Sequence, residues 1–428
     1  MKIAFYLPNK GLRNVDCRNL EDGNPGIGGT EYIIQATAYY ILKQNISDVD
    51  IILGAHFVDL INANIPVVKI ESVDDFIHKT NPDYLLFKYE KKTYAQANVA
   101  VKNTRTKLII WAHNFIPRTE LTRLSDDKNV ARIVCVSKEQ LQLYRDHKAF
   151  LKSSFIYNGI PIPKIVNYLD IPPLTSRPNE ITYIGSIVEY KGFCQLAKAW
   201  PEILKVVPDA RLNVIGSGKL YDRNSIMGPY GIAEKSFEET FMPYLTDKNG
   251  NILPSVKFWG VLGTEKNEIL KRTRVGVPNP SGISETFCIT ALEMQLMGGI
   301  ITTINYGGFK NTVYRKTGIL YSNINELASC IIKQLSADDN DIEGCYTFIR
   351  ENFSFDKIAK EWITLFEKLE KQTCDLLEYE NYDNDICLKI KEINRKIKTN
   401  LPFGYLLPTV EFYLSILRRL KVIKLWKK

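Results

Sequence analysis

The sequence from residue 275 to residue 308, VGVPNPSGISETFCITALEMQLMGGIITTINYGG, has the pattern of one β-α-β unit. Residues 275–277 form a short apolar run that prolines end, so we predict a buried strand and then a loop over 278–286. Residues 287–297 carry apolar side chains at helical spacing, and the glycines at 298–299 mark the end of that helix. A second strand follows them. The loop thus leads to a helix N-terminus, where free N–H groups and the helix dipole favour an anion such as phosphate.

Two carboxylates, Glu285 and Glu293, lie on either side of this helix start. Glu residues at this spacing occur by chance in many chains, and solvated helix acids are the simplest interpretation of the spacing alone. Their position beside a loop of Pro, Ser and Gly favours another interpretation. The carboxylates would bind sugar hydroxyls while the N–H groups at the helix start bind phosphate.

The stretch resembles the signature of the retaining nucleotide-sugar glycosyltransferases of family 4. That signature has a Pro-Ser loop, a Glu, a Phe-Gly-like pair, a second Glu and a Gly-rich loop; here Cys288 replaces the Gly of the pair. These enzymes have the GT-B fold, which implies an α/β protein with two Rossmann-like domains facing a central cleft. A C-terminal helix then crosses back to the first domain. The resemblance also implies that Glu293 binds the donor ribose and Glu285 the sugar hydroxyls, and that the donor is contacted by Thr286, Phe287, Cys288 and Ile289.

The composition indicates a two-domain globular protein. With 428 residues, 45% hydrophobic and 24% charged, the chain is long enough for two separate cores. Its net charge of +8 is lower than expected of a dedicated nucleic-acid-binding protein, but it suits phosphorylated substrates and anionic lipid surfaces. The eight cysteines include no C-x-x-C pair, which indicates reduced thiols in the cytoplasm. We find no signal segment and no apolar run of the ~20 residues that span a membrane, so we expect a cytoplasmic protein, soluble or peripheral on the inner membrane face.

The first half of the chain begins like a Rossmann domain. Residues 2–7 are an apolar strand, residues 8–29 form a long loop that ends in glycines, and residues 32–42 have a helical pattern. A glycine cluster alone indicates no more than a flexible loop. In family 4 a Gly-Gly turn at this place approaches the donor and the acceptor. The resemblance therefore implies contacts from Gly28 and Gly29 and makes the long loop a candidate acceptor site.

One histidine follows directly after a predicted strand. His113 comes after residues 107–111, and ligands bind at the carboxyl edge of open parallel sheets. A lone histidine is more often structural, but family 4 places a His here against the donor sugar, which implies a catalytic role for His113. Residues 155–160 resemble the segment where the family passes to its second domain, and we place the boundary near residue 165. The other strands predicted in this half are residues 49–53, 67–70, 84–87 and 133–137.

The second half begins with a strand over residues 180–185. Family 4 has an Arg after this strand and a Lys-Gly pair five residues later, and the two cations bind the donor diphosphate. Lys191 and Gly192 match the pair, but Ser186 occupies the Arg position. A lone lysine is often only solvated, although a point charge here would still hold phosphate. The resemblance implies a catalytic role for Lys191 and places Ser186 beside the donor.

Two later turns are expected to contact the nucleotide. The turn after the next strand is similar to the family's Gly-x-Gly turn, which implies donor contacts from Gly216 and Gly218; it is not a Walker A loop. Residues 256–262 resemble the family's next strand and turn, which implies that the backbone near Leu262 contacts the base. Residues 221–251 are an insert to which the pattern assigns no structure.

These patterns divide the chain into four parts. Residues 354–370 have the pattern of an amphipathic helix, and in the family such a helix crosses back onto the first domain. We expect an acceptor domain over residues 1–165 and a nucleotide-sugar domain over 166–353. The crossing helix follows, and residues 371–428 form a C-terminal extension.

The sequence gives no sign of a metal site. Three D-x-D triplets, at residues 48–50, 339–341 and 383–385, have the spacing used by another glycosyltransferase fold. The first precedes its strand and the other two lie in polar stretches, so we interpret all three as solvated acids. We expect no metal and no cofactor; the donor substrate would be a nucleotide-diphosphate sugar.

The end of the chain is basic and amphipathic. Between residues 409 and 423 the apolar side chains fall on one helical face, and six Lys or Arg residues lie between 418 and 428. A basic helix with a Trp near its end suits an anionic bilayer surface, so residues 409–428 are a candidate membrane-binding segment. Docking of this helix on the protein or on a partner is the alternative.

These features together predict a retaining, metal-independent, hexosyltransferase-type enzyme. It would move a sugar from a nucleotide-diphosphate sugar to a saccharide acceptor, lipid-linked, in surface polysaccharide biosynthesis. Ser186 motivates one alternative, a nucleotide-sugar-binding scaffold subunit with little catalysis. A GT-B epimerase, which would convert the donor without an acceptor, is the other.

Overall fold

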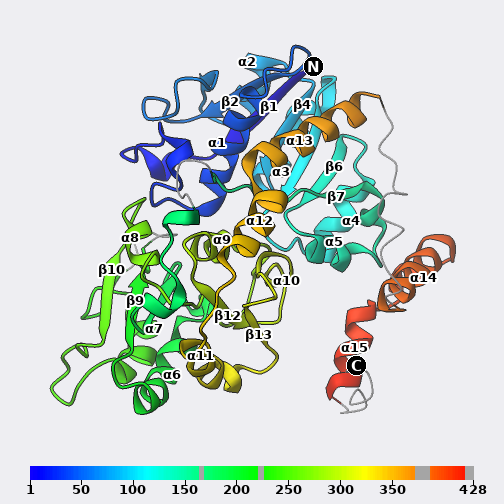
Figure 1. Ribbon diagram of the computed structural model, residues 1–428. Coiled ribbons are helices and arrows are strands. Elements are labelled where there is room, and N and C mark those ends of the chain that lie inside the picture. Colours follow the sequence, from blue (N-terminus) through cyan, green and yellow to red (C-terminus); the bar gives the residue numbers. More distant parts are fainter. Residues whose placement is uncertain (163–167, 220–225, 372–385, 420–428) are drawn as a thin grey trace.

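The computed structural model describes residues 1–162, 168–219, 226–371 and 386–419. It contains two α/β domains, and a long helix, α13 (Phe355–Glu370), returns from the second domain to lie along the first (Figure 1). Each domain is built on a single parallel sheet with helices around it. The prediction of two Rossmann-like domains with a returning helix is confirmed.

The first domain has a seven-stranded sheet in the order β3-β2-β1-β4-β5-β6-β7, and all its neighbouring strands run parallel. Its strands are nearly continuous apolar runs because helices cover both faces. In β5, Ile109 and Ile110 are both fully buried but belong to different core clusters. The strands are β1 (Lys2–Leu7), β2 (Asp50–Ala55), β3 (Val67–Lys69), β4 (Tyr84–Lys88), β5 (Lys107–Ala112), β6 (Val130–Cys135) and β7 (Ser153–Phe155). The helices are α1 (Gly29–Leu42), α2 (Val73–Thr80), α3 (Lys91–Ala100), α4 (Arg118–Asp126) and α5 (Lys138–Tyr144).

The second domain has a six-stranded parallel sheet in the order β10-β9-β8-β11-β12-β13. Its strands are β8 (Glu180–Ile184), β9 (Arg211–Ile215), β10 (Val256–Gly260), β11 (Val275–Gly276), β12 (Ile300–Ile304) and β13 (Ile319–Tyr321). The helices are α6 (Phe193–Val206), α7 (Lys235–Phe241), α8 (Lys266–Leu270), α9 (Ile289–Leu296), α10 (Phe309–Thr312), α11 (Leu327–Leu335) and α12 (Ile342–Phe353). In both sheets the first strand lies inside the sheet, and the strand order reverses beside it. Ligands of open parallel sheets bind at such reversal points.

The helix that the sequence predicts from residue 287 begins two residues later, at Ile289. Cys288 precedes it with a left-handed backbone, φ 74°. Glycine adopts this conformation without strain, and the family signature has glycine at this position; for cysteine the conformation is unfavourable. The left-handed residue separates the turn at Thr286 and Phe287 from α9.

The insert that the sequence left without a structure folds around a buried carboxylate. Glu238 in α7 accepts hydrogen bonds from the backbone amides of Tyr230 (2.8 Å), Ile232 (2.8 Å) and Ala233 (3.0 Å). These bonds tie the loop before α7 to the helix. Residues 221–225 of the predicted insert lie outside the described part of the chain.

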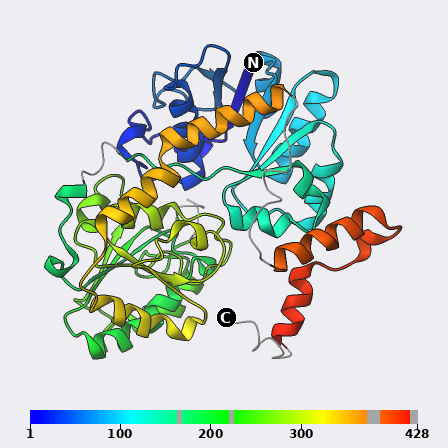
Figure 2. The same cartoon turned by 45° about the vertical axis from the view of Figure 1, so that its right-hand side comes forward.

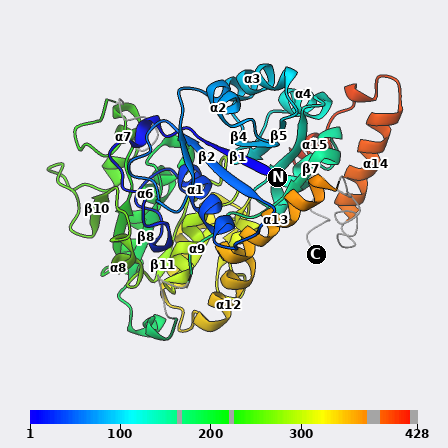
Figure 3. The ribbon, with the colours of Figure 1, turned by 90° about the horizontal axis from the view of Figure 1, so that it is seen from above.

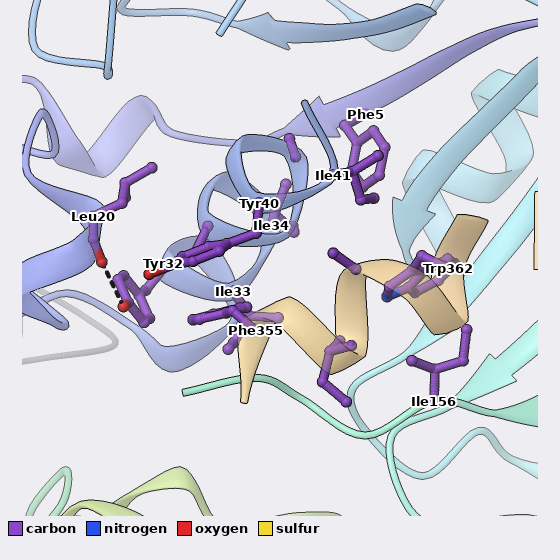
Figure 4. Packing of buried hydrophobic residues seen from close by; sticks show 14 of the residues in the cluster. Phe5, Leu20, Tyr32, Ile33, Ile34, Tyr40, Ile41, Ile156, Phe355 and Trp362 are labelled. Carbon is purple, nitrogen blue, oxygen red and sulfur yellow. Dashed lines mark hydrogen bonds between the residues drawn. The ribbon is translucent and has the colours of Figure 1, made fainter. Parts of the chain in front are cut away.

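Aromatic rings attach α13 to the first domain (Figure 4). The Phe355 ring stacks on Tyr40 of α1, with centroids 4.7 Å apart, and Trp362 meets Trp111 of β5 edge-on at 4.8 Å. All four rings are buried, and Ser354 caps the helix by accepting a hydrogen bond from the Lys357 amide. The returning helix is therefore part of the first domain's core.

The two passages of the chain between the domains run side by side. The Ile160 amide donates to the Phe353 carbonyl (2.8 Å), and the Phe355 amide donates to the Ile160 carbonyl (3.2 Å). A side chain at Gly159 would overlap the Phe355 ring, which explains the glycine at this crossing. The boundary predicted near residue 165 falls within residues 163–167, outside the described part.

The C-terminal extension forms a pair of helices, α14 (Ile386–Asn400) and α15 (Val410–Arg419). Figures 2 and 3 show the pair at the outer side of the first domain, near α4 and α5, with α15 projecting away from α14. Residues 372–385, and residues 420–428 of the predicted membrane segment, lie outside the described part.

Candidate active site

A cavity of about 440 Å³ lies between the two domains. Its walls come from the carboxyl edges of both sheets and from the N-termini of α1 and α9. Thirteen of the fourteen residues that the sequence predicts for the site line this cavity: Gly28, Gly29, His113, Ser186, Lys191, Gly216, Leu262, Glu285, Thr286, Phe287, Cys288, Ile289 and Glu293. The structure thus brings residues from six separate segments together at one place.

Gly218 is the predicted residue that does not line the cavity. Its amide donates to the Ile232 carbonyl (3.0 Å), and a side chain at this position would contact the Ala233 backbone. Gly218 therefore packs against the insert before α7. Of the predicted Gly-x-Gly turn, Gly216 lines the cavity and Gly218 does not.

The loop before α9 holds Glu285 in a fixed position. Its Oε2 accepts a hydrogen bond from Asn279 Nδ2 (2.9 Å) and lies 2.9 Å from Lys191 Nζ. The glycine at 308 lets the next loop pass directly over Phe287, and the Gly308 amide donates to the Glu285 carbonyl (3.1 Å). Glu285, expected on the donor sugar, and Lys191, expected on its diphosphate, are thus paired with each other.

Glu293 also has a cationic partner, one that the sequence analysis did not identify. Lys266 Nζ lies 3.2 Å from Glu293 Oε1, and the two side chains are only 7% and 14% exposed. The same Nζ approaches the Gly263 carbonyl (3.3 Å) and the carbonyl of Asn24 in the first domain (3.4 Å). Lys266 therefore joins the candidate ribose site to the long loop of the first domain.

His113 lies in the first-domain wall as an uncharged imidazole. Burial, and secondarily the charge of Lys88, lowers its pKa to about 3. Its Nε2 is buried and has no hydrogen-bond partner, while its carbonyl accepts a bond from Thr286 Oγ1 of the other domain (2.6 Å). A buried nitrogen without a partner beside a cavity is suited to a ligand hydroxyl.

Ser186 provides no charge at the position where the family has Arg. It is buried, it lines the cavity, and its hydroxyl donates to the Ser217 carbonyl (3.4 Å). Several polar lining residues were missed by sequence reasoning, among them Glu31, Lys88, Asn114, Asn158, Lys266 and Asn279. The Asn158 Oδ1 is another buried atom without a partner.

The described residues contain no group of three or more His, Cys, Asp and Glu side chains that could hold a metal ion. Of the D-x-D acids, Asp48 and Asp50 are exposed, whereas Asp341 accepts a hydrogen bond from the Tyr314 hydroxyl (2.5 Å) and lies 2.9 Å from Lys316 Nζ. The triplet at 383–385 lies outside the described part. None of the described helices is long and apolar enough to cross a membrane.

Comparison with known proteins connects this cleft to glycosyl transfer. Residues 178–337 match the sequence model of the family described as "Glycosyl transferases group 1". The structure is similar to that of HepE from Anabaena in complex with UDP and glucose, with a TM-score of 0.62 at 15% identity over 86% of this chain and 100% of HepE. The protein has the GT-B glycosyltransferase fold.

Two further GT-B structures match over most of their length. A glycosyltransferase from Rickettsia africae gives a TM-score of 0.63 at 16% identity, covering 86% of this chain and 98% of the other. The lipopolysaccharide outer core galactosyltransferase WaaB gives 0.58 at 14% identity, covering 86% and 100%. Among curated protein sequences no match is found. The family match over residues 178–337 supports glycosyl transfer, and the solved structures support the GT-B fold.

Proposed function

We propose that the protein is a retaining, metal-independent glycosyltransferase that moves a sugar from a nucleotide-diphosphate sugar to a saccharide acceptor. The observation that carries the proposal is the convergence of His113, Glu285, Glu293 and the start of α9 on one interdomain cavity. The solved complex of HepE with UDP and glucose makes a UDP-sugar the first donor to test.

The proposed reaction exchanges one bond at the anomeric carbon of the donor sugar. The bond from this carbon to the β-phosphate oxygen breaks, and a bond to the acceptor hydroxyl oxygen forms on the same face. The hydroxyl proton leaves with the departing diphosphate. Stabilising the charge on that diphosphate is the main task of the site, and we assign it to Lys191 and to the backbone amides at the start of α9.

The donor would have to replace two ion pairs. Lys191 and Glu285 form one, and Lys266 and Glu293 form the other. A diphosphate would take Lys191, after which Glu285 would accept hydrogen bonds from sugar hydroxyls; Glu293 would do the same for the ribose. The uncharged His113, with its unpartnered Nε2, would face the sugar from the opposite wall. The two pairs thus hold both carboxylates in position before the donor arrives.

The two alternatives predict different products. A scaffold subunit would bind a nucleotide sugar without consuming it, and an epimerase would form a new nucleotide sugar without an acceptor. Purified protein should be screened for thermal stabilisation by UDP-, GDP-, ADP- and dTDP-sugars, because a ligand that binds only the folded state raises the melting temperature. The stabilising donor is then incubated with saccharide acceptors, and the product is followed by NMR.

We expect a new glycoside whose anomeric configuration equals that of the donor. Glu285→Gln should lose this activity, and Glu268→Gln should keep it, because Glu268 is exposed on α8 away from the cavity. An inverted product refutes the retaining mechanism. Donor binding without any turnover supports the scaffold, and conversion without an acceptor supports the epimerase.

We also propose that the acceptor is lipid-linked and that the C-terminal extension holds the enzyme at an anionic membrane surface. Residues 386–428 contain eleven Lys or Arg and two Glu. Eleven of the 23 large hydrophobic side chains exposed among the described residues lie between Ile390 and Leu417. Such a concentration marks an interaction surface, and its charge favours anionic lipid.

The helix α14 has an unusual orientation that supports this proposal. Two of its basic side chains are buried against the protein: Lys391 donates to the Gln142 carbonyl (3.3 Å), and the Arg395 guanidinium lies 4.6 Å from the Phe150 ring centroid. On the opposite side Ile393 is 57% exposed. The sequence predicted a membrane-binding segment over residues 409–428, whereas the exposed apolar side chains of the described part of the extension begin at Ile390.

Asp146 of the first domain joins the two helices to the enzyme. Its side chain is 2% exposed and accepts hydrogen bonds from the Val410 amide (2.8 Å) and Asn394 Nδ2 (3.3 Å). Arg118 and Lys398 lie 3.3 and 3.5 Å from its carboxylate. Burial alone would raise the pKa of Asp146, but these partners hold it below its ordinary value. The extension is thus attached by polar contacts, which leave its apolar side chains available to a membrane.

Sedimentation with liposomes tests the membrane proposal. The double variant Ile393→Ser/Ile397→Ser removes two exposed apolar side chains of α14, and Val99→Ser, which is 66% exposed on α3 in the wild type, is the control. We expect the double variant to bind less to vesicles of 30% anionic lipid, and the wild type to bind less as salt rises. Equal sedimentation of the double variant and the wild type would refute the role of this surface.

A further inference from the structure

Each lysine on the described second-domain wall of the cavity has its counter-ion inside the cavity. Lys191 Nζ lies 2.9 Å from Glu285 Oε2, and Lys266 Nζ lies 3.2 Å from Glu293 Oε1. Both carboxylates line the cavity together with the lysines. A bound diphosphate would therefore bring two negative charges to a wall whose charges already balance. A buried charge without compensation is unfavourable, so the diphosphate requires a further cation.

Lys88 faces the same cavity from the first domain. It is the last residue of β4, at the carboxyl edge of the sheet, and its side chain is 19% exposed. Its counter-ion is Glu90, whose Oε1 lies 3.1 Å from Nζ; Glu90 is 49% exposed and does not line the cavity. An ion pair with an exposed partner is weak, so Lys88 can exchange it for a phosphate at little cost.

The first-domain wall has no other cation among its described lining residues. His113 lies there too, but burial keeps its imidazole uncharged at neutral pH, and the nearby charge of Lys88 acts in the same direction. On the opposite wall, Ser186 stands where the family signature has Arg, and its hydroxyl is turned to the Ser217 carbonyl. The second-domain wall thus has no second cation at Ser186, whereas the first-domain wall has Lys88.

We propose that Lys88 binds the donor diphosphate from the first domain and supplies the second cation that Ser186 does not. This inference rests on the function proposed above. When the bond between the anomeric carbon and the β-phosphate oxygen breaks, its electron pair stays on that oxygen. A hydrogen bond from the Lys88 ammonium strengthens as this charge develops, so Lys88 lowers the barrier as well as binding the donor.

We call the two lysines that bind the diphosphate, Lys191 and Lys88, the clamp. It differs from a pair of cations that both belong to the second domain. Lys191 and Lys88 lie on different domains, so a diphosphate that both bind holds the domains together. The clamp is complete only when the cleft is closed around the donor. The domains then close in the same step in which the diphosphate charge is stabilised. The closed cleft keeps water away from the departing diphosphate.

Calorimetric titration of Lys88→Gln with UDP and with uridine tests the proposal. Loss of a charge-assisted hydrogen bond should weaken UDP binding about tenfold or more. Uridine has no phosphate, and its binding should not change. Lys92→Gln is the control, since Lys92 is an exposed lysine of α3 outside the cavity, and its UDP affinity should equal that of the wild type.

A second substitution restores the cation in the other wall. Ser186 lines the cavity, so Ser186→Arg places a guanidinium at the family position. In the Lys88→Gln background we expect Ser186→Arg to recover most of the lost UDP affinity and turnover. The melting temperature of the double variant is measured first, and if this variant does not fold, the Lys88→Gln titration decides alone.

The outcomes separate this inference from the proposed function. Equal UDP affinity of Lys88→Gln and the wild type overturns the inference, as does an equal loss for UDP and uridine. A higher KM for the acceptor with unchanged UDP affinity assigns Lys88 to an anionic acceptor and also overturns it. If the wild type prefers GDP, ADP or dTDP, that nucleotide and its nucleoside replace UDP and uridine. If it binds none of the four, the proposed function itself fails.

Discussion

Replacing Glu293 by Ala should affect stability and donor binding at once, because Glu293 is the buried counter-ion of Lys266. The two side chains are 14% and 7% exposed, and their charged atoms are 3.2 Å apart. Removing one member of a buried ion pair costs about 3–5 kcal/mol, since the other charge stays buried and unpaired. Lys266 keeps two carbonyl neighbours, at 3.3 and 3.4 Å, so we expect a cost near the lower end, about 3 kcal/mol.

The loss of stability should be visible in a thermal melt followed by circular dichroism. In a domain of this size, about 3 kcal/mol corresponds to a decrease of about 6–12 °C in the melting temperature. The donor effect is measured separately, by calorimetric titration with UDP or with the nucleotide that stabilises the wild type most. The lost ribose contact should weaken binding by about tenfold, as expected for one hydrogen bond to a charged group.

A double variant separates the two effects. Glu293→Ala/Lys266→Met has no unpaired charge, and apolar replacement of a buried pair is often neutral for stability. We expect it to melt near the wild-type temperature while its nucleotide affinity stays low. Glu268→Ala, which breaks an exposed pair on the same helix as Lys266, should change neither property. The reasoning is refuted if Glu293→Ala melts like the wild type, or if the double variant is as unstable as the single one.

Four further predictions concern metal removal and the residues His113, Gly159 and Asp146. Turnover should persist in EDTA, and loss that magnesium or manganese reverses would contradict the metal-free mechanism. His113→Ala should lower kcat more than it weakens nucleotide binding, because His113 faces the sugar; steady-state kinetics with matched titrations test this. Gly159→Ala should lower the melting temperature, since its Cβ would overlap the Phe355 ring, at a cost of about 1–3 kcal/mol. Asp146→Asn should speed proteolytic cleavage of the C-terminal extension. Because the folded pKa of Asp146 is lowered, its stabilising contribution is complete above its ordinary pKa near 3.8 and is lost as pH falls from there through the folded pKa. Acid should therefore loosen the extension more in the wild type than in Asp146→Asn.

The sequence was sufficient to predict the fold because both domains follow simple rules. Strands buried on both faces are continuous apolar runs, such as Lys107–Ala112, and they alternate with helices and glycine turns. Chains of this pattern form parallel sheets. The start of α9 was misjudged by two residues, since nothing in residue type indicates that Cys288 adopts a backbone conformation that normally belongs to glycine.

The sequence could indicate which residues meet at the cavity where their placement depends on strand ends, but not where it depends on pairs distant in sequence. His113 and Ser186 follow strands of the two sheets, and the carboxyl ends of parallel strands lie at one edge of their sheet. Lys266 precedes Glu293 by more than twenty residues and comes from another helix, so no periodicity relates the two. Lys88 is the last residue of β4, as His113 is the first after β5, and this position at a strand end is the signal that could have identified it.

The contacts between the domains differ in strength on the two sides of the cavity. On one side the chain passes twice between the domains, and Ile160 pairs with Phe353 there through backbone hydrogen bonds. On the cavity side polar contacts also join the domains, from Thr286 to the His113 carbonyl and from Lys266 to the Asn24 carbonyl, beside the packing of Phe287 on Tyr157. Single polar contacts are easily exchanged for contacts with a ligand, whereas the paired backbone and the aromatic core of α13 are not. We therefore expect the domains to open by rotation about the crossing at Ile160 and Phe353. A donor that binds both walls would stabilise the closed form, which the polar contacts also favour.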